Sequence, residues 1–324
     1  MTVLTDWFSL RHAPVPTTAL EIAFNRVSAA TVDLHGSRAT VSAHAVELLP
    51  DGAIAPSLTS ANLRDRGAVL AAVKRVLDAT GHPRRLALIL PDPVAKVSLL
   101  KFEKTPQSEA DLDQLVRWQV RKGAPFPIED AQVSYVRGAR LPDGQEFIAT
   151  MARRDVIREY EEVCEAAGAH AGLVDISTFN VVNAVLAGDP GQTGDWLLVN
   201  VAPDYASIAI LRGQDLLFFR SRAADADGTL ADLVHQTAMY YQDRLSGSGF
   251  GRVLLCGAAA AGGRQAIDVD QIRKSVEQRL QTPVQTVDPR TAVTLADRIT
   301  ASHALLDTLA PVVGALLRGR EAAA

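Results

Sequence analysis

The stretch LEIAFNRVSAATVDL, residues 20–34, holds two apolar segments on either side of a tight turn at residues 24–26. Such a pair is typical of neighbouring antiparallel strands. Further along, Val41, Ala43 and Ala45 stand at alternate positions, and apolar residues at helical spacing follow before a short apolar run. We predict strands over residues 20–24, 26–34 and 39–48, with a turn at 36–37, a helix from about residue 62 to Gly81, and a buried strand over residues 85–90.

The second half of the chain repeats this order of elements. We predict strands over residues 196–201, 206–211 and 215–220, a helix from Thr229 to about residue 245, and a buried strand over residues 251–256. The two halves share almost no residue identity, so the duplication is one of architecture.

A segment of different character separates the two copies. It contains an expected strand over residues 95–102, a helix that begins at a capping box at Ser108 and continues to Ala124, a hairpin, and a helix that ends at Gly168. The run Pro125-Phe126-Pro127 ends the first of these helices, since proline lacks an N–H group. An amphipathic helix over about residues 299–317 closes the chain. The expected divisions are a flexible N-terminal arm (1–18), a first lobe (19–92 and 172–194), an inserted subdomain (93–171) and a second lobe (195–320).

The amino-acid composition excludes several classes of protein. The 324 residues are 48% hydrophobic and 22% charged, with a formal net charge of −4, which is globular and does not favour a nucleic-acid-binding surface. No apolar run has the length of a membrane helix, and the start does not resemble a signal peptide. Cys164 and Cys256 lie in apolar stretches, so we expect buried thiols in a reducing compartment. The histidines show no metal-ligand spacing, and no metal is expected.

A duplicated unit of three strands, a helix and a strand, with an insertion in the first copy, indicates an α/β (α+β) protein with the actin-like, ribonuclease-H-like fold. In that fold the first turn of each copy directs backbone N–H groups at a phosphate, and an acid organises Mg²⁺ or water. Glycine at these turns allows the close approach.

The middle and end of the chain resemble the PilM family of type IV pilus assembly proteins. The similar features are a strand that ends in Leu90-Pro91, the Arg117-Trp118 pair on a helix, the Pro125-Phe126-Pro127 stop and the closing helix around Gly314. The Tyr240-Tyr241 pair and the strand end at 254–257 are similar too. The resemblance covers about residues 18–318 and implies an actin-like fold with an inserted 1C-type subdomain.

Both phosphate turns depart from the family pattern. Where the family has Asp-Ile-Gly, this chain has Glu21-Ile22-Ala23. Phe24 and Arg26 occupy the positions of the family's small hydroxyl residues, and Ser28 stands where the family has a lysine. The second turn has Asn200 and Ala202 in place of Asp and Gly, and one glycine, Gly257, remains of the family pair. We therefore expect a degenerate nucleotide cleft formed by Glu21, Ala23, Asn25, Asn200, Ala202 and Gly257, no catalytic residues and no cofactor, with ATP and Mg²⁺ as the ligands it would take if it binds any.

The resemblance implies a cytoplasmic scaffold, peripheral at the inner membrane, that serves pilus assembly and twitching motility. Its implied partner is the N-terminal cytoplasmic segment of a PilN-like inner-membrane protein, which would lie in a groove between the first lobe and the inserted subdomain; pilus motor ATPases are further implied partners. Trp118, Arg121, Phe126 and Pro127 are the candidate partner-binding residues, with Trp118 and Phe126 as plain core residues the alternative.

Two other functions stay open from the sequence. One is an active actin-like ATPase with a site rebuilt around Glu21 and Asp204. The other is the cytoplasmic module of a type II secretion platform, a GspL-like protein, although the chain lacks the transmembrane helix and periplasmic domain expected there.

Overall fold

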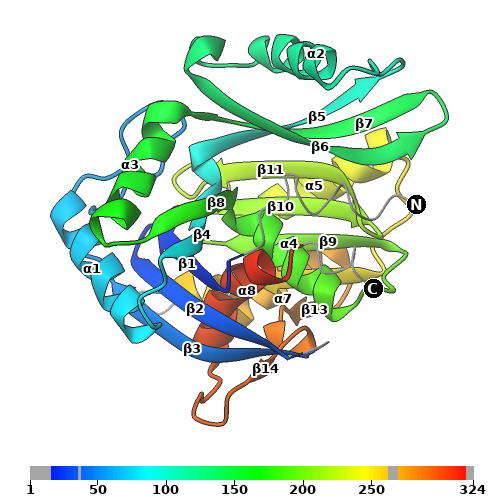
Figure 1. Cartoon of the computed structure of the whole chain (residues 1–324). Coiled ribbons are helices and arrows are strands. Elements are labelled where there is room, and N and C mark those ends of the chain that lie inside the picture. The colour runs from blue at the N-terminus through cyan, green and yellow to red at the C-terminus, as the bar shows by residue number, and fades with distance from the viewer. Residues whose placement is uncertain (1–15, 36–37, 262–268, 319–324) are drawn as a thin grey trace, which may run out of the picture.

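The computed structural model describes residues 16–35, 38–261 and 269–318. Most of the predicted N-terminal arm and the predicted turn at residues 36–37 lie outside these ranges. The chain forms two large sheets with helices on both faces, and a third, smaller sheet that stands on top of them (Figure 1).

The first large sheet is built from the stretch that opens the sequence. Its strands are β1 (Thr18–Ala23), β2 (Arg26–His35), β3 (Arg38–Leu48), β4 (Arg85–Leu90), β8 (His170–Ile176) and β14 (Thr294–Leu295), in the spatial order β14-β3-β2-β1-β4-β8. β1, β2 and β3 are antiparallel neighbours, while β4 runs parallel to β1. The helix α1 (Arg66–Ala79) connects β3 to β4.

The second large sheet repeats this topology. Its strands are β9 (Asp195–Val201), β10 (Tyr205–Arg212), β11 (Asp215–Ala223), β12 (Arg252–Cys256) and β13 (Val284–Thr286), in the order β11-β10-β9-β12-β13. Again three antiparallel strands precede a helix, α5 (Leu230–Leu245), and a strand parallel to the first. Thr229 begins α5 with a capping box, in which the Asp232 amide donates to the Thr229 hydroxyl at 3.1 Å. The duplication predicted from the sequence is confirmed.

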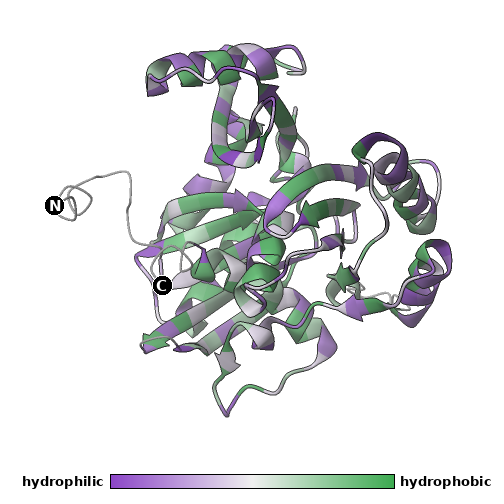
Figure 2. Ribbon diagram, turned by 90° about the vertical axis from the view of Figure 1, so that its right-hand side faces the viewer, coloured by the Kyte–Doolittle hydropathy of each residue, from purple (hydrophilic) through white to green (hydrophobic). Residues whose placement is uncertain are grey.

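The inserted sheet has the order β5-β7-β6, with β5 (Ala95–Phe102), β6 (Ala131–Leu141) and β7 (Gly144–Arg153) all antiparallel. One of its faces carries α2 (Glu109–Arg121), which packs Leu112, Val116 and Val120 on the sheet. This unit projects from the body of the molecule (Figure 2). α2 ends three residues earlier than predicted, before Gly123.

Two helix starts also differ from the prediction. α1 begins at Arg66 instead of about Asn62, because Asp65 is the N-cap and accepts from the Ala68 amide at 2.9 Å. The closing helix α8 (His303–Leu317) begins four residues later than predicted, at the N-cap Ser302.

The third helix packs in a different part of the molecule from the one to which the expected division of the chain assigns it. From the sequence, α3 (Arg154–Ala166) is expected in the inserted subdomain, residues 93–171. Its apolar face, which includes Val156, Tyr160 and Cys164, packs in the core of the first lobe beside α1 and β4. Cys164 and Cys256 are both buried, free thiols, and burial raises the pKa of Cys164 to about 12.

The helices at the centre of the molecule exchange sheets. α4 (Ser177–Gly188) follows β8 of the first sheet but packs Val181, Val182 and Val185 on the second sheet. α8, the end of the second half, packs on the first sheet instead of its own. The two helices lie against each other between the sheets (Figure 1), so neither lobe completes its core without the other half of the chain.

The crossing of α4 and α8 depends on Gly314. A Cβ atom at this position would lie 1.7 Å from the carbonyl oxygen of Asn180 and 2.6 Å from its carbon. Both are backbone atoms, so relief requires a shift of a whole helix.

We expect Gly314→Ala to lower the free energy of unfolding by about 1–3 kcal/mol, because overpacking outweighs the helix propensity that alanine gains. The measurement is denaturant unfolding beside Gly194→Ala, a matched control at a glycine where an added Cβ atom would meet nothing within 4 Å. Equal stability of the two variants would contradict a close backbone contact at the crossing.

Candidate functional site

The first turns of the two lobes face each other across a small cavity of about 20 Å³. Among the residues that line it are five of the six cleft residues predicted from the sequence, namely Glu21, Ala23, Asn200, Ala202 and Gly257. The sixth, Asn25, stands at the β1–β2 turn, where its Oδ1 accepts from Arg26 Nη1 at 3.4 Å. About 20 Å³ holds one water molecule, whereas small-molecule sites measure roughly 300–1,000 Å³.

The chain's own charges fill the first-lobe side of the cavity. Arg26 folds into it and donates from Nη2 to Glu21 Oε2 at 3.1 Å, and both side chains are at most 10% exposed. The other Glu21 oxygen, Oε1, accepts from the Ser177 hydroxyl at 2.9 Å, and Ser28 donates to Oε2 at 3.4 Å. Glu21 is therefore held by a cation and two hydroxyl groups. In the sequence, Arg26 stands out as a departure from the family pattern, but nothing there marks it as the partner of Glu21.

A second group of polar side chains ties the lobes together. The carboxylate of Asp92, in a 3₁₀ turn (Asp92–Val94) after β4, accepts from the Thr178 amide at 3.0 Å and from the Thr178 hydroxyl. Asn200 at the end of β9 donates to the same hydroxyl at 2.9 Å. Burial raises the pKa of Asp92 to about 6, although the hydrogen bonds from Thr178 oppose this. Asn200, where the family has an acid, thus serves as a neutral donor between the lobes.

Packing and backbone conformation require glycine at position 257. Its φ is +82°, and a Cβ atom would lie 2.2 Å from the carbonyl oxygen of Val201. The amide groups beyond it are taken by the chain itself, because the Ala259 amide donates to Asp307 Oδ2 at 2.7 Å. Asp307 comes from α8, and no local motif marks it in the sequence.

A much larger pocket, of about 380 Å³, lies between the inserted sheet, the first lobe and the edge of the second sheet. Its lining is mostly apolar and includes Val136, Ile148, Leu173, Ile176, Phe179 and Leu216. Three strands that line it, β6, β8 and β11, each stand at the end of their sheet's strand order. We call this pocket the groove. It lies between the first lobe and the inserted subdomain, where the family resemblance implies a partner-binding groove, but its lining comes from widely separated segments that no sequence motif connects.

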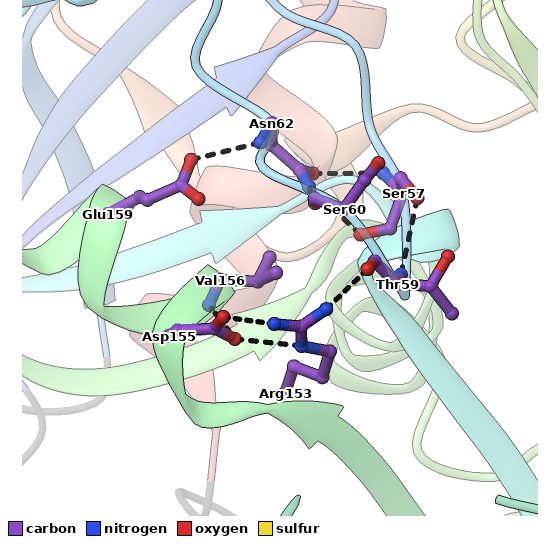
Figure 3. A network of polar contacts seen from close by, with 8 residues as sticks. All are labelled: Ser57, Thr59, Ser60, Asn62, Arg153, Asp155, Val156 and Glu159. Atoms are coloured by element: carbon purple, nitrogen blue, oxygen red, sulfur yellow. Dashed lines mark hydrogen bonds and ion pairs between the residues drawn. The ribbon is translucent and has the colours of Figure 1, made fainter. Parts of the chain in front are cut away.

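A polar network fixes the inserted sheet to the first lobe beside the groove (Figure 3). Arg153, the last residue of β7, donates to the Thr59 carbonyl and pairs with Asp155, with 2.9 Å between Nε and Oδ1. On α3, Glu159 accepts from the Asn62 amide at 2.9 Å, and Asn62 in turn holds the loop through the Ser57 carbonyl at 2.9 Å. The loop and the α3 start therefore act as one support for the inserted sheet.

The four residues predicted to bind a partner do not line the groove. Trp118 is 57% exposed on the outer side of α2, where Lys122 Nζ lies 3.8 Å from its ring centre. Arg121 and Pro127 are exposed, and Phe126 is half-buried against the core of the inserted subdomain. The core alternative therefore does not describe Trp118.

Within the described ranges, no group of three or more His, Cys, Asp or Glu side chains could hold a metal ion. The helices of the same ranges include none long and apolar enough to cross a membrane.

Comparisons with known proteins agree on the fold. The family model described as type IV pilus assembly protein PilM matches residues 20–242. A solved structure of a PilM-PilN type IV pilus biogenesis complex is similar with a TM-score of 0.79 and 17% identity, over 95% of this chain and 99% of the other. The solved structure of the cytoplasmic domain of EpsL, an inner-membrane component of the type II secretion system of Vibrio cholerae, is similar with a TM-score of 0.50 and 8% identity. The match covers 95% of this chain and 94% of the other. Among curated protein sequences, none matches.

The duplicated sheets and the cavity between their first turns define an actin-like fold with an inserted subdomain. Because the family model spans more than half of the chain, the protein belongs to the PilM family and has a role in type IV pilus assembly.

Asp204, which is with Glu21 one of the two acids of the rebuilt-site alternative, is not among the residues that line the cavity. Its buried carboxyl group nevertheless gives a test by pH. Its Oδ1 is buried without a hydrogen-bond partner, and burial raises the pKa from 3.8 to about 6. The folded state thus holds this proton more tightly than the unfolded state, so Asp204 lowers stability as pH rises from about 4 to 6.

We expect the free energy of unfolding of Asp204→Asn, relative to wild type, to rise across this window and then level off. Denaturant unfolding at pH 4, 5, 6 and 7 measures it, and Asp225→Asn, at an exposed loop position, controls for the loss of one charge. A difference that stays constant with pH would show that Asp204 ionises as freely as in the unfolded chain.

Proposed function

We propose that this protein is a scaffold of the pilus inner-membrane platform, which binds the N-terminal cytoplasmic tail of a PilN-like membrane protein in the groove and does not hydrolyse ATP. The observation that carries the proposal is the contrast between the two pockets. The nucleotide cleft has room for about one water, while the groove offers about 380 Å³ of mostly apolar space. The similar solved structure is that of a PilM-PilN complex, which supports a partner of this kind.

The groove suits an extended segment of chain. β8 pairs with β4 on one side and β6 pairs with β7, so within the described residues each has an edge without a neighbouring strand. A bound segment would donate and accept backbone hydrogen bonds along such an edge, which fixes its register. Its alternate side chains would fill the apolar space around Leu173, Ile176 and Phe179.

The polar contacts of the cleft support the proposed absence of hydrolysis. An acid that organises Mg²⁺ must direct its charge at the ion, whereas Glu21 Oε2 is paired with the Arg26 cation and Oε1 accepts from Ser177. Asn200 carries no charge, and Asp307 competes with a phosphate for the amide groups after Gly257. The lobes would therefore stay closed without nucleotide and hold the groove in one shape.

In this role the protein is cytoplasmic and stays at the inner membrane through its partner. It would connect the platform to the pilus motor ATPases, and loss of it would impair twitching motility. The exposed Trp118 and its neighbour Arg121 lie on the far side of the inserted sheet from the groove, so they are free for a second partner.

The rebuilt ATPase remains the second candidate, since the buried Asp204 oxygen has no partner. It requires the Glu21–Arg26 pair to open. The type II secretion module is the third, and the match to EpsL shows a shared fold only.

For the groove, we expect Val136→Asp to weaken binding of the PilN-like tail peptide at least tenfold, or about 1.4 kcal/mol. Val136 lines the groove and is 50% exposed, so the fold tolerates the change, but a bound segment would bury the new carboxylate unpaired. Calorimetric titration measures the affinity.

The matched control is Val46→Asp, at a strand residue 41% exposed that does not line the groove. Trp118→Ala should also bind the peptide as wild type does. If binding is lost in the two control variants, or if Val136→Asp binds the peptide as tightly as wild type, the tail binds elsewhere.

For the cleft, titration of the protein with ATP and Mg²⁺ should give no binding up to about 1 mM ATP, an affinity limit near −4 kcal/mol. Micromolar binding together with hydrolysis that Glu21→Gln abolishes would favour the rebuilt ATPase instead.

A further inference from the structure

The groove contains one pair of opposite charges in otherwise neutral surroundings. Of the described residues that line it, only Asp175 has an acidic carboxyl group and only Arg318 a basic side chain. Arg318 Nη1 donates to Asp175 Oδ2 at 2.7 Å. An ion pair set among apolar side chains is costly to desolvate, so its position calls for a physical reason.

The two members of the pair differ in how firmly they are held. Asp175 belongs to β8, is in register with Ile89 of β4, and accepts from the Ile176 amide at 2.8 Å through Oδ1. Its side chain is 16% exposed. Burial raises its pKa, and the charge of Arg318 opposes that shift. Arg318 follows the end of α8, and its side chain is 41% exposed. The carboxylate is therefore fixed, whereas the guanidinium can turn into solvent.

A cation beside the buried Asp175 carboxylate offsets the cost of removing its charge from water, and Arg318 supplies that cation in the empty groove. A segment that enters the groove covers Asp175 further, so it must either keep Arg318 in place or bring a cation of its own. Cytoplasmic segments next to membrane helices are rich in Lys and Arg. A membrane-protein tail of this type can supply such a cation beside its apolar residues.

We propose that Asp175 determines the specificity of the groove by pairing with a Lys or Arg of the bound tail, and that Arg318 holds this place while the groove is empty. This inference rests on the proposed function, because it assumes a PilN-like tail in the groove. Arg318 then acts as an intramolecular competitor. Apolar segments without a cation do not gain from displacing it, which separates the partner from other apolar peptides.

The test uses the full chain and a synthetic peptide of the N-terminal cytoplasmic tail of the PilN-like protein from the same genome. A second set of peptides has each Lys or Arg replaced in turn by Gln. Calorimetric titration compares wild type, Asp175→Asn and Arg318→Gln, after thermal unfolding has shown that the variants are folded.

We expect Asp175→Asn to bind the unchanged peptide at least tenfold more weakly, and Arg318→Gln to bind it about threefold or more tightly, since the competitor is gone. One Gln-substituted peptide should bind wild type more weakly than the unchanged peptide does. On Asp175→Asn the same two peptides should bind almost equally, which identifies the replaced residue as the cation that pairs with Asp175. Arg318→Gln keeps Asp175 intact, so it remains informative if Asp175→Asn fails to fold.

Two results would overturn the proposal. If each Gln substitution in the peptide lowers its affinity by the same factor for wild type and for Asp175→Asn, Asp175 pairs with no cation of the tail. Weaker binding by Arg318→Gln would show that Arg318 contacts the tail directly. In either case, if Val136→Asp still weakens binding of the tail peptide, the groove remains its binding site. If the peptide does not bind wild type at all, both the proposed function and this inference are wrong.

Discussion

The close crossing of α4 and α8 at Gly314 sets the geometry of everything else in this protein. The two helices meet backbone to backbone, and each completes the core of the opposite lobe. Both therefore reach both sites. α4 begins with Ser177 in the cleft and continues with Phe179 along the groove, while α8 gives Asp307 to the cleft and precedes Arg318 at the groove. A small displacement of either helix would alter the two sites together, since protein interiors are close-packed.

The two sites solve the problem of buried charge in different ways. In the cleft, Glu21 is neutralised by Arg26 from the same hairpin, and the hydroxyl groups of Ser28 and Ser177, also from the first lobe, donate to it. All three donors to Glu21 therefore belong to the chain itself, whereas Arg26 Nε is buried without a hydrogen-bond partner. In the groove, the partner of Asp175 is a side chain at the edge of the described chain, half open to solvent. Among the described residues, the groove has apolar walls and sheet edges without a neighbouring strand, and these features are the basis for proposing it as the binding site.

Much of the fold follows from local signals in the sequence. The alternation around Val41, the turn before Arg26 and the capping box at Thr229 act over a few residues, and the strands and helix predicted from them are present. Long-range packing could not be predicted in this way. Nothing near residue 154 indicates that α3 joins the first lobe, and Asn62 suggests a helix start although it holds a loop instead. For the sites, family spacing found Glu21 and Asn200, whereas Asp307 and the groove lining come from distant segments, and the exposed Trp118 is not part of the groove.

Hydrogen exchange of the backbone amides, with and without the PilN-like tail peptide, tests the central claim most directly, because it reports on cleft and groove in one experiment. A scaffold that binds the tail in its groove predicts slower exchange along β8 (His170–Ile176) and β6 (Ala131–Leu141), with no change at the turn between β1 and β2. Protection at that turn and around Gly257, with β6 and β8 unaffected, would contradict it and return the binding function to the cleft.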